Sequence, residues 1–413
     1  MRTLNILIVC EHASNVFGGE AMLPLNYFRL LSNTEHQVYL ITHARVKSSI
    51  EQITELNQDH VFYIPDTWMH RFLHRNCGFL PERVRVVIVG FLMHLITQIY
   101  QWKIARRVIR DKKIDVIHEP APVSATQPSA MFGLGVPVII GPMNGGMAFP
   151  KAFAHMSGKF EKVVYKMVSL FSTFYNLIIP GKLLAKQLLV ANQRTAKSLP
   201  KFTCGEVIEL VENGVFSSRD TPILTNKRDG INVLFVGRLV DWKVVDVVID
   251  AVGITKNPVN FIIVGDGDER ASLEQLAQSK GYHQVQFIGM VPHSEVNRYY
   301  DEADIFVLPS VRECGGAVVL EAMARGLPVI ATNWGGPADY ITADTGYLID
   351  PISREYMVAE FARHIDLLAT NPELRYQIGM AAIQRVKQYF MWDTKIITMI
   401  EHYQSVVDAQ ISK

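Results

Sequence analysis

The sequence is poor in cysteine, and the few cysteines that it has are far apart. They show neither a Cys-x-x-Cys pair nor a Cys/His spacing typical of metal sites. We therefore expect neither a disulfide framework nor a zinc site, and a reducing compartment such as the cytoplasm fits this usage. The four cysteines are Cys10, Cys77, Cys204 and Cys314.

Long uninterrupted hydrophobic runs are also absent. The most apolar stretch, Val84–Tyr100, is broken by Arg85, Gly90, His94 and Gln98, so we expect no membrane-spanning helix. Residues 4–10 are apolar but too short for the core of a secretory signal. An amphipathic segment that lies on a membrane surface stays open as an interpretation.

No excess of one charge sign marks the whole chain, whose formal net charge is +1, but the charges are unevenly distributed. Residues 1–200 carry about +10 and residues 201–413 about −9. The basic half indicates contact with something anionic, such as a lipid surface or an acidic acceptor, and we expect no nucleic-acid partner. Alternatively, the opposite charges only help the two halves to attract each other.

The chain has 413 residues, which favours two domains because single cores rarely grow beyond about 250–300 residues. The first half opens with a buried strand at Ile6–Val9, a glycine turn and a helix from about Met22 to Leu31. Further strands are expected at Val38–Thr42 and Val136–Ile140, among others. Alternating strands and helices indicate a parallel sheet covered by helices on both faces.

A second alternating series starts near Ile231, and several of its strands end at a glycine. We therefore expect an α/β protein with two Rossmann-like, doubly wound parallel-sheet domains that face each other across a cleft. The predicted domains are residues 1–205 and 206–390, and we expect a C-terminal helix in 391–413 to cross back to the first domain.

Two carboxylates, Glu313 and Glu321, stand eight residues apart after an expected strand at Ile305–Leu308. Gly315 and Gly316 lie between them, so backbone amides at the start of the next helix can approach an anionic ligand closely. Ligands of doubly wound sheets bind at this edge. A helical glutamate can also hold a pair of ribose hydroxyls, although both glutamates would be ordinary surface residues if the pattern stood alone.

Two cations follow an earlier strand of the same half. Gly237 ends this strand, Arg238 comes next, and Lys243 lies five residues further on. Arginine and lysine at a strand exit can hold a diphosphate and neutralise its charge as it leaves. Taken singly, either cation would more often be a solvated surface group.

Together these residues resemble the C-terminal domain of the family-4 (group 1) retaining glycosyltransferases, which have the GT-B fold. The resemblance is dense over about 210–350 and weaker but continuous over 1–200. It is carried by Arg238, Lys243, Glu313 and Glu321 together with Asn213-Gly214-Val215, Gly265-Asp266-Gly267, Gly289-Met290-Val291-Pro292, Ala303–Ser310, Pro328–Ala331 and Gly335-Gly336.

The resemblance implies a role for each matching position. Arg238 and Lys243 would hold the donor diphosphate, Glu313 the hydroxyls of the donor sugar, and Glu321 the ribose. The remaining donor-binding positions would be Gly18, Gly19, Gly237, Val291, Gly315, Gly316, Ala317 and Val318. At Gly315 the family often has an aromatic residue, so the sugar pocket is expected to be roomier and the donor sugar is left open.

In the first half, the resemblance implies that Gly18-Gly19 approaches the diphosphate and that His118, expected just after a short strand, points into the cleft as a catalytic residue. A second glycine loop, which contains Asn144, Gly145 and Gly146, is expected to line the acceptor side. Structural roles, as a plain turn or a core histidine, remain the alternatives for these residues.

No metal and no further cofactor is expected beside the UDP- or GDP-sugar co-substrate. Asp266-Gly267-Asp268 has the form of a metal-binding Asp-x-Asp motif, but it lies in a strand–turn–helix context, where glycine supplies the turn and aspartate caps the helix.

We expect a retaining, metal-independent hexosyltransferase that moves a sugar from a nucleotide diphosphate to a glycan or lipid-linked acceptor in polysaccharide or glycolipid biosynthesis. A sugar-nucleotide epimerase of the same fold, a glycan phosphorylase and a non-catalytic binding or scaffold protein are the alternatives. The segment Phe160–Ile179 mixes aromatic residues with Lys162 and Lys166, which suits peripheral contact at the cytoplasmic face of a membrane.

Overall fold

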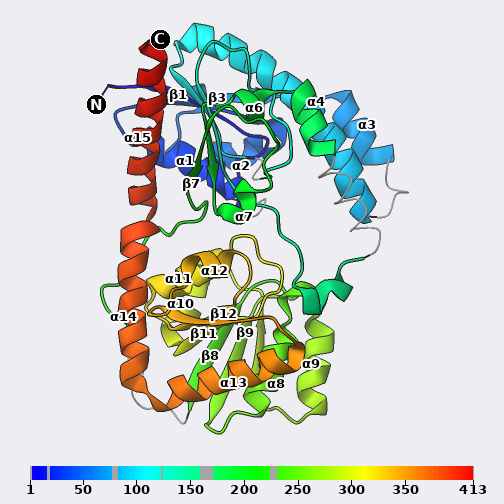
Figure 1. The fold of residues 1–413 in the computed structure, drawn as a ribbon, viewed down its shortest axis with the longest axis vertical. Coiled ribbons are helices and arrows are strands. Elements are labelled where there is room, and N and C mark those ends of the chain that lie inside the picture. Colours follow the sequence, from blue (N-terminus) through cyan, green and yellow to red (C-terminus); the bar gives the residue numbers. More distant parts are fainter. Residues whose placement is uncertain are drawn as a thin grey trace. The chain divides into compact units, whose positions relative to one another are not determined.

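The structure is a computed structural model, and it describes residues 2–15, 19–76, 82–121, 124–158, 171–223 and 230–412. Within these residues the chain forms two compact units (Figure 1). The first unit contains the described residues of Met1–Gly146, Lys159–Glu212 and Ile396–Lys413, and the second contains those of Met147–Gly158 and Asn213–Lys395. Each unit is built on one parallel sheet.

The first unit has a seven-stranded sheet with the order β3-β2-β1-β4-β5-β6-β7, in which every neighbouring pair is parallel. Its strands are β1 (Asn5–Val9), β2 (Gln37–His43), β3 (Val61–Ile64), β4 (Val116–Glu119), β5 (Val138–Met143), β6 (Gln187–Val190) and β7 (Glu206–Glu209). Its helices include α1 (Gly19–Ser32), α2 (Lys47–Glu51), α3 (Trp68–Asn76), α4 (Glu82–Lys112), α6 (Gly181–Leu184) and α7 (Gln193–Ala196).

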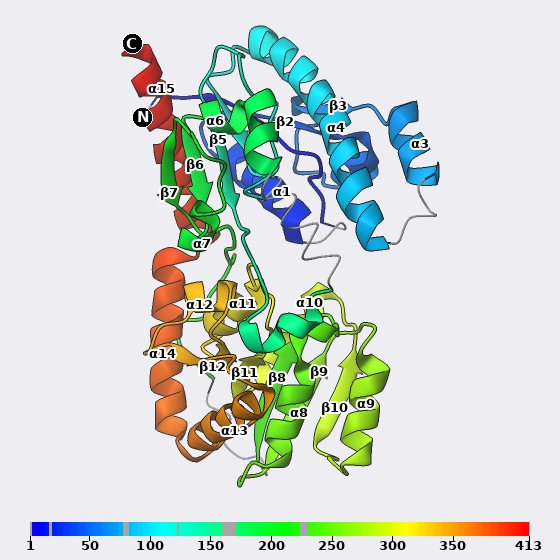
Figure 2. The ribbon, with the colours of Figure 1, turned by 45° about the vertical axis from the view of Figure 1, so that its right-hand side comes forward.

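The second unit has a six-stranded parallel sheet with the order β10-β9-β8-β11-β12-β13. The strands are β8 (Ile231–Val236), β9 (Val259–Val264), β10 (Val285–Gly289), β11 (Ile305–Leu308), β12 (Val329–Thr332) and β13 (Gly346–Ile349). The helices are α8 (Val245–Gly253), α9 (Arg270–Ser279), α10 (His293–Glu302), α11 (Ala317–Ala324), α12 (Gly336–Tyr340), α13 (Arg354–Thr370) and α14 (Pro372–Tyr389). Figure 2 shows β8, β9 and β10 side by side with α8 and α9 along them.

Alternation along the central strands gives the first sheet two apolar faces. Ile117 of β4 lies in the core cluster that includes Ala105 and Val108 of α4. The neighbouring residue His118 points the other way, where its ring contacts Tyr27 of α1 and Tyr403 of α15 (Trp392–Ile411). Because successive side chains of a strand point to opposite faces, a nearly continuous apolar strand buries both faces under helices.

The first unit extends beyond the predicted boundary at residue 205, because residues 206–209 form β7 and pair with β6. Their exposed, partly charged pattern is typical of an edge strand and gave no strong strand signal in the sequence. At the other end, α15 begins in the second unit, and its residues from Ile396 onward belong to the first. Gly18 and most of Phe160–Ile179 lie outside the described residues.

Candidate active site

The second sheet has one point where its strand order reverses, between β8 and β11, which are hydrogen-bonded neighbours. Loops that leave two such strands diverge to opposite sides and open a crevice at the carboxyl edge of the sheet, where ligands of this fold class bind. Arg238 and Lys243 follow β8, and Glu313, Gly315 and Gly316 follow β11. The structure therefore brings the predicted cations and the predicted carboxylate together at one edge.

Lys243 and Glu313 form an ion pair between the two loops, from the Lys243 Nζ to the Glu313 Oε2. Their side chains are 13% and 16% exposed, so both charges are largely removed from water. A hydrogen bond of 2.9 Å from the Val311 amide to the Trp242 carbonyl joins the same two loops. The pair satisfies both charges when no ligand is present, and an anionic ligand could take over the lysine.

Arg238 differs from Lys243, because it is exposed and forms no ion pair with any described residue. It directly follows Gly237, whose amide donates a 3.0 Å hydrogen bond to the Val264 carbonyl of β9. This bond fixes the backbone at the end of β8, while the guanidinium is left in solvent. The site thus offers one positive charge that is already paired and one that is available.

The loop after β11 leads directly into helix α11. Gly316 is the residue before the helix and has a φ of 75°, a left-handed conformation that favours glycine. No side chain caps this helix start, so the amides of its first turn, beginning at Ala317 and Val318, are suited to an anion. The sequence-predicted amide site is therefore present as a geometric feature.

A second glycine pair holds this loop in place. The Gly336 amide donates a 2.9 Å hydrogen bond to the Glu313 carbonyl. A Cβ atom on Gly336 would lie 2.0 Å from the Gly315 carbonyl oxygen, and one on Gly335 would lie 2.0 Å from that of Glu313. Our assignment of roles passed over these two glycines, although they belong to the motif that carried the resemblance.

Glu321 lies on α11 and accepts a 2.9 Å hydrogen bond from the Tyr300 hydroxyl through its Oε2. Tyr300 of α10 is 1% exposed, and burial together with the neighbouring Glu321 carboxylate raises the pKa of its hydroxyl well above the ordinary value. The tyrosine therefore remains a donor and orients the carboxylate. Sequence reasoning missed Tyr300, because nothing in its spacing distinguishes it from a core aromatic residue.

Val291 follows β10 and lies at the same carboxyl edge of the sheet, with β9 between its strand and β8. The Asp266-Gly267-Asp268 segment follows β9. Asp266 accepts a 2.8 Å hydrogen bond from the Gly267 amide and forms a 3.0 Å ion pair with Arg270. Asp266 thus serves the turn and the first residue of α9, although the residue directly before α9 makes no side-chain cap.

His118 does not lie where the sequence placed it. We expected it after a strand and pointing into the cleft, but it lies inside β4 and is fully buried. Its Nε2 is 2.7 Å from the Gly141 carbonyl oxygen, and its Nδ1 is 2.7 Å from the Tyr403 hydroxyl. Burial lowers the pKa of its imidazole to about 4. These contacts describe a neutral core histidine, which the sequence analysis had kept as the alternative.

The predicted acceptor-side loop is also bound internally. The Asn144 side chain donates a 2.8 Å hydrogen bond to Glu212, and the Gly145 amide donates one of 3.0 Å to the Thr195 hydroxyl. A Cβ atom on Gly146 would lie 2.3 Å from the Ser198 hydroxyl. The loop therefore packs against α7 and the residues that follow it, within the first unit. Gly19 is the first residue of α1.

The first sheet has its own order reversal, between β1 and β4, and a carboxylate lies there that we did not predict. Glu11 follows β1, and its Oε2 and Oε1 lie 3.7 Å from the Nδ1 of His94 and 3.6 Å from the Nε2 of His12. Burial alone would raise the pKa of Glu11, but the histidines outweigh it and hold the pKa below its usual range. An acidic residue directly after the strand Ile6–Val9 was the available signal.

Comparison with known proteins gives a family match in the second unit. Residues 218–385 match the family model described as glycosyl transferases group 1. Over 141 residues the chain is 35% identical to a 2-deoxystreptamine N-acetyl-D-glucosaminyltransferase of Niallia circulans, which covers 33% of this chain and 36% of that protein. Over 219 residues it is 31% identical to the sulfoquinovosyl transferase SQD2 of Arabidopsis thaliana, which covers 51% of this chain and 41% of that protein.

Solved structures cover the chain almost completely. A glycosyltransferase of Rickettsia africae has a TM-score of 0.65 at 15% identity, covering 98% of this chain and 99% of that one. Alr3699/HepE of Anabaena, determined with UDP-glucose, has a TM-score of 0.64 at 16% identity, covering 97% and 100%. These likenesses show the GT-B fold, with two Rossmann-like domains.

Residues 218–385 are therefore similar to the glycosyl transferases group 1, and this sequence similarity is concentrated in the second unit. The chain aligns with 41%, 36% and 30% of the lengths of the first three curated relatives. Such partial matches do not establish the donor, the acceptor or the stereochemistry of transfer.

Proposed function

We propose that the protein is a retaining, metal-independent glycosyltransferase of family 4, which transfers a hexose from a nucleotide diphosphate to a glycan or lipid-linked acceptor. The observation that carries this proposal is the pairing of Lys243 with Glu313 beside the free guanidinium of Arg238 and the uncapped start of α11. Cations, backbone amides and a carboxylate at one edge match the phosphates and hydroxyls of a sugar nucleotide.

The proposed chemistry follows from where charge develops. As the bond between the sugar and the phosphate breaks, negative charge grows on the leaving diphosphate. Arg238, Lys243 and the amides from Gly315 to Ala317 would stabilise it. Lys243 would exchange part of its contact with Glu313 for the phosphate, and this frees Glu313 to bind hydroxyls of the sugar. Attack from the same face, with the departing phosphate accepting the acceptor's proton, would give retention.

A UDP-sugar is the first donor to test, because Alr3699/HepE was determined with UDP and with UDP-glucose. Glu321, held by Tyr300, would bind the ribose hydroxyls, and Val291 would meet the base through its backbone. Likeness in fold to Alr3699/HepE does not identify the donor sugar of this chain. Gly315, where the family often has an aromatic residue, is consistent with a roomy sugar pocket. GDP-sugars remain the second choice.

The test is binding and slow hydrolysis of a panel of UDP-, GDP- and ADP-sugars, measured by calorimetry and by nucleotide release. Glu313→Gln and Lys243→Ala should each reduce turnover at least about tenfold, because each loses a contact to the developing charge. Lys387→Ala is the matched control, since Lys387 pairs with Asp220 outside the site. Failure of every sugar nucleotide to bind would overturn the assignment of the donor site.

Product analysis separates the remaining possibilities. Proton NMR of the first sugar released from a UDP-α-sugar should show the α anomer if the reaction proceeds with retention, and the β anomer would contradict it. Formation of an isomeric sugar nucleotide without an acceptor would indicate an epimerase. Binding without any turnover would favour a non-catalytic protein. His118→Gln should leave the stereochemistry unchanged, in keeping with the buried position of His118.

We propose peripheral contact with an anionic membrane at the cytoplasmic face, in glycolipid or polysaccharide biosynthesis. Within the described residues, no helix has the length and apolarity needed to cross a membrane. Exposed large apolar residues occur instead on α3, with Trp68 at 68% and Phe72 at 55%, and in the helical segment 171–178, with Phe174 at 56% and Ile178 at 62%. Arg71, also exposed, adds positive charge to α3.

Co-sedimentation with vesicles tests the membrane proposal. Vesicles that contain about 30% phosphatidylglycerol should retain the protein at low salt, and pure phosphatidylcholine vesicles should retain it less. Trp68→Glu should weaken binding, whereas Ile411→Glu, at an exposed apolar position of α15, should not. Equal binding by both variants would show that α3 is not part of the membrane-binding surface.

A further inference from the structure

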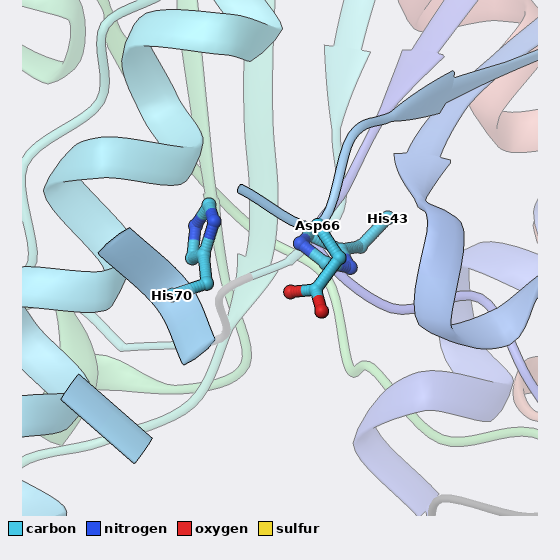
Figure 3. A group of neighbouring side chains, drawn as sticks. All are labelled: His43, Asp66 and His70. Carbon is cyan, nitrogen blue, oxygen red and sulfur yellow. The ribbon is translucent and has the colours of Figure 1, made fainter. Parts of the chain in front are cut away.

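Three potential metal ligands gather in the first unit, at the carboxyl ends of β2 and β3. His43 is the last residue of β2, Asp66 follows β3, and His70 lies in the first turn of α3. One potential ligand atom from each residue lies within 4.8 Å of the other two. Figure 3 shows the three side chains together, from β2, from the loop after β3 and from α3. We propose that they form a binding site for a divalent transition metal such as Zn²⁺.

The residue types suit such an ion. Imidazole nitrogens and a carboxylate oxygen are borderline ligands that zinc, cobalt and nickel accept. The rings of His43 and His70 lie edge to face, with their centroids 5.1 Å apart. The two imidazoles therefore occupy one place beside the Asp66 carboxylate.

A separate observation points to a missing partner at the same place. The Nε2 of His43 is buried and has no hydrogen-bond partner among the described residues. The whole residue is 1% exposed, so water does not readily replace that partner. Buried polar atoms are nearly always satisfied. Coordination through Nε2 would satisfy this one, and it would shift the proton to Nδ1 and give up a 3.2 Å hydrogen bond from the Arg45 amide.

His70 already has the support that ligating histidines usually have. The Thr97 hydroxyl donates its proton to the Met93 carbonyl at 2.9 Å, so it can only accept from the His70 Nε2 at 3.2 Å. That contact places the ring proton on Nε2 and leaves the lone pair on Nδ1. A ligating histidine commonly donates its other N–H in this way. The Nδ1 now accepts a 3.3 Å hydrogen bond from the Thr67 amide and contacts the Thr67 hydroxyl at 2.8 Å, and a metal would replace both.

The arginines around Asp66 oppose metal binding. The Oδ1 of Asp66 forms a 2.9 Å ion pair with Arg45, and its Oδ2 is 4.0 Å from Arg71. These cations repel a metal ion, so we expect moderate affinity and coordination through Oδ2. Tetrahedral zinc holds its ligand atoms about 3.3 Å apart, so the side chains must close by up to about 1.5 Å. The fourth position would be open to water. Bound metal would join β2, β3 and α3.

This site is independent of the proposed transferase activity, and the sequence gave no sign of it. The three residues span 28 positions without a motif spacing. They become neighbours only because β2 and β3 are adjacent parallel strands. We had expected no metal site in this chain, and the proposal replaces that expectation for the first unit.

The test is equilibrium dialysis of the chelator-treated full chain against Zn²⁺, with the bound metal counted by mass spectrometry, and against Co²⁺, followed by its visible spectrum. We expect one ion per chain and a raised melting temperature. His43→Gln and His70→Gln should each weaken binding at least about tenfold and abolish the thermal shift. His364→Gln is the matched control, because His364 is a buried histidine of the second unit.

Two outcomes would overturn the proposal. One is the absence of stoichiometric binding of either metal. The other is binding that survives in both His43→Gln and His70→Gln, which would place the ion elsewhere on the protein. Circular dichroism establishes that each variant is folded. If one histidine variant fails to fold, Asp66→Asn in the otherwise unchanged chain takes its place in the comparison.

Discussion

Val244 is a strained residue directly after Lys243, the lysine of the proposed donor site. It has φ 39° and ψ 46°, a left-handed conformation that costs a β-branched residue about 1–3 kcal/mol. The residue is 7% exposed, and it turns the chain from the short helix Asp241–Lys243 into α8. Burial of its side chain thus holds the strain and fixes the backbone from which Lys243 projects.

We expect Val244→Gly to lower the free energy of unfolding by only about 1 kcal/mol, because relief of strain offsets most of the lost burial. Val245→Gly is the control. Val245 is equally buried at the start of α8 but unstrained, and its loss should cost about 3 kcal/mol. Urea unfolding measures both. Equal losses would mean that Val244 stores no strain.

His118 makes stability depend on pH, because its folded pKa of about 4 lies below the ordinary value of 6.5. Above pH 6.5 the histidine is neutral in both states and has no effect. As the pH falls from 6.5 to 4, this histidine becomes protonated in the unfolded chain but stays neutral in the folded chain. The free energy of unfolding therefore falls by about 3 kcal/mol. His118→Gln should flatten this slope in urea titrations, whereas His283→Gln, at an exposed position, should leave it unchanged. An unaltered slope in His118→Gln would contradict the assignment.

At the scale of elements, the start of α12 supports the loop that leads into α11. The backbones of the two approach each other closely, since a Cβ on Gly336 would lie 2.0 Å from the Gly315 carbonyl oxygen and 2.4 Å from that of Cys314. Neither carbonyl can move without displacing the amides before α11. The conformation of the proposed anion site therefore depends on a second loop, which follows β12.

Gly336→Ala should lower the free energy of unfolding by about 1–3 kcal/mol, because backbone must move to admit the methyl group. It should also weaken UDP binding at least about tenfold, as measured by calorimetry. Gly90→Ala is a useful comparison, since a Cβ there meets no atom of the described residues within 4 Å and the change should leave UDP binding unchanged. Normal UDP affinity in Gly336→Ala would show that the loop conformation does not depend on this contact.

At the scale of the whole molecule, the chain forms two compact units. Each unit has its own parallel sheet, with one point where the strand order reverses. All the proposed diphosphate-binding side chains lie in the second unit. A ligand that binds only there stabilises that unit directly, by about 2.7 kcal/mol at a hundredfold excess over its dissociation constant.

We therefore expect UDP to raise the melting temperature of the chain, and Arg238→Ala to reduce the shift by removing a phosphate contact. Uridine, which lacks the phosphates, should produce a smaller shift than UDP at the same concentration. Differential scanning calorimetry measures all three. If uridine stabilises as strongly as UDP, the cations do not bind the diphosphate.

The sequence by itself determined the fold class, and it predicted which residues lie at the carboxyl edge of the second sheet. Apolar runs ending at glycine predicted parallel strands, because buried parallel strands are apolar on both faces. Arg238, Lys243 and Glu313 follow expected strands, and this order predicted that they share one edge, since strand ends of a doubly wound sheet converge there. These inferences rest on local patterns, which neighbouring residues in the chain are enough to specify.

Only the tertiary structure decided which polar side chains are buried, and by what. His118 was expected just after a strand and pointing into the cleft, yet Tyr403, 285 positions away, contacts its ring. Tyr300 proved to orient Glu321, and His43, Asp66 and His70 proved to be neighbours. Such contacts depend on how strands pair and helices cover them, and the polar partner of a buried group is set by that long-range packing, not by the residues beside it in the sequence.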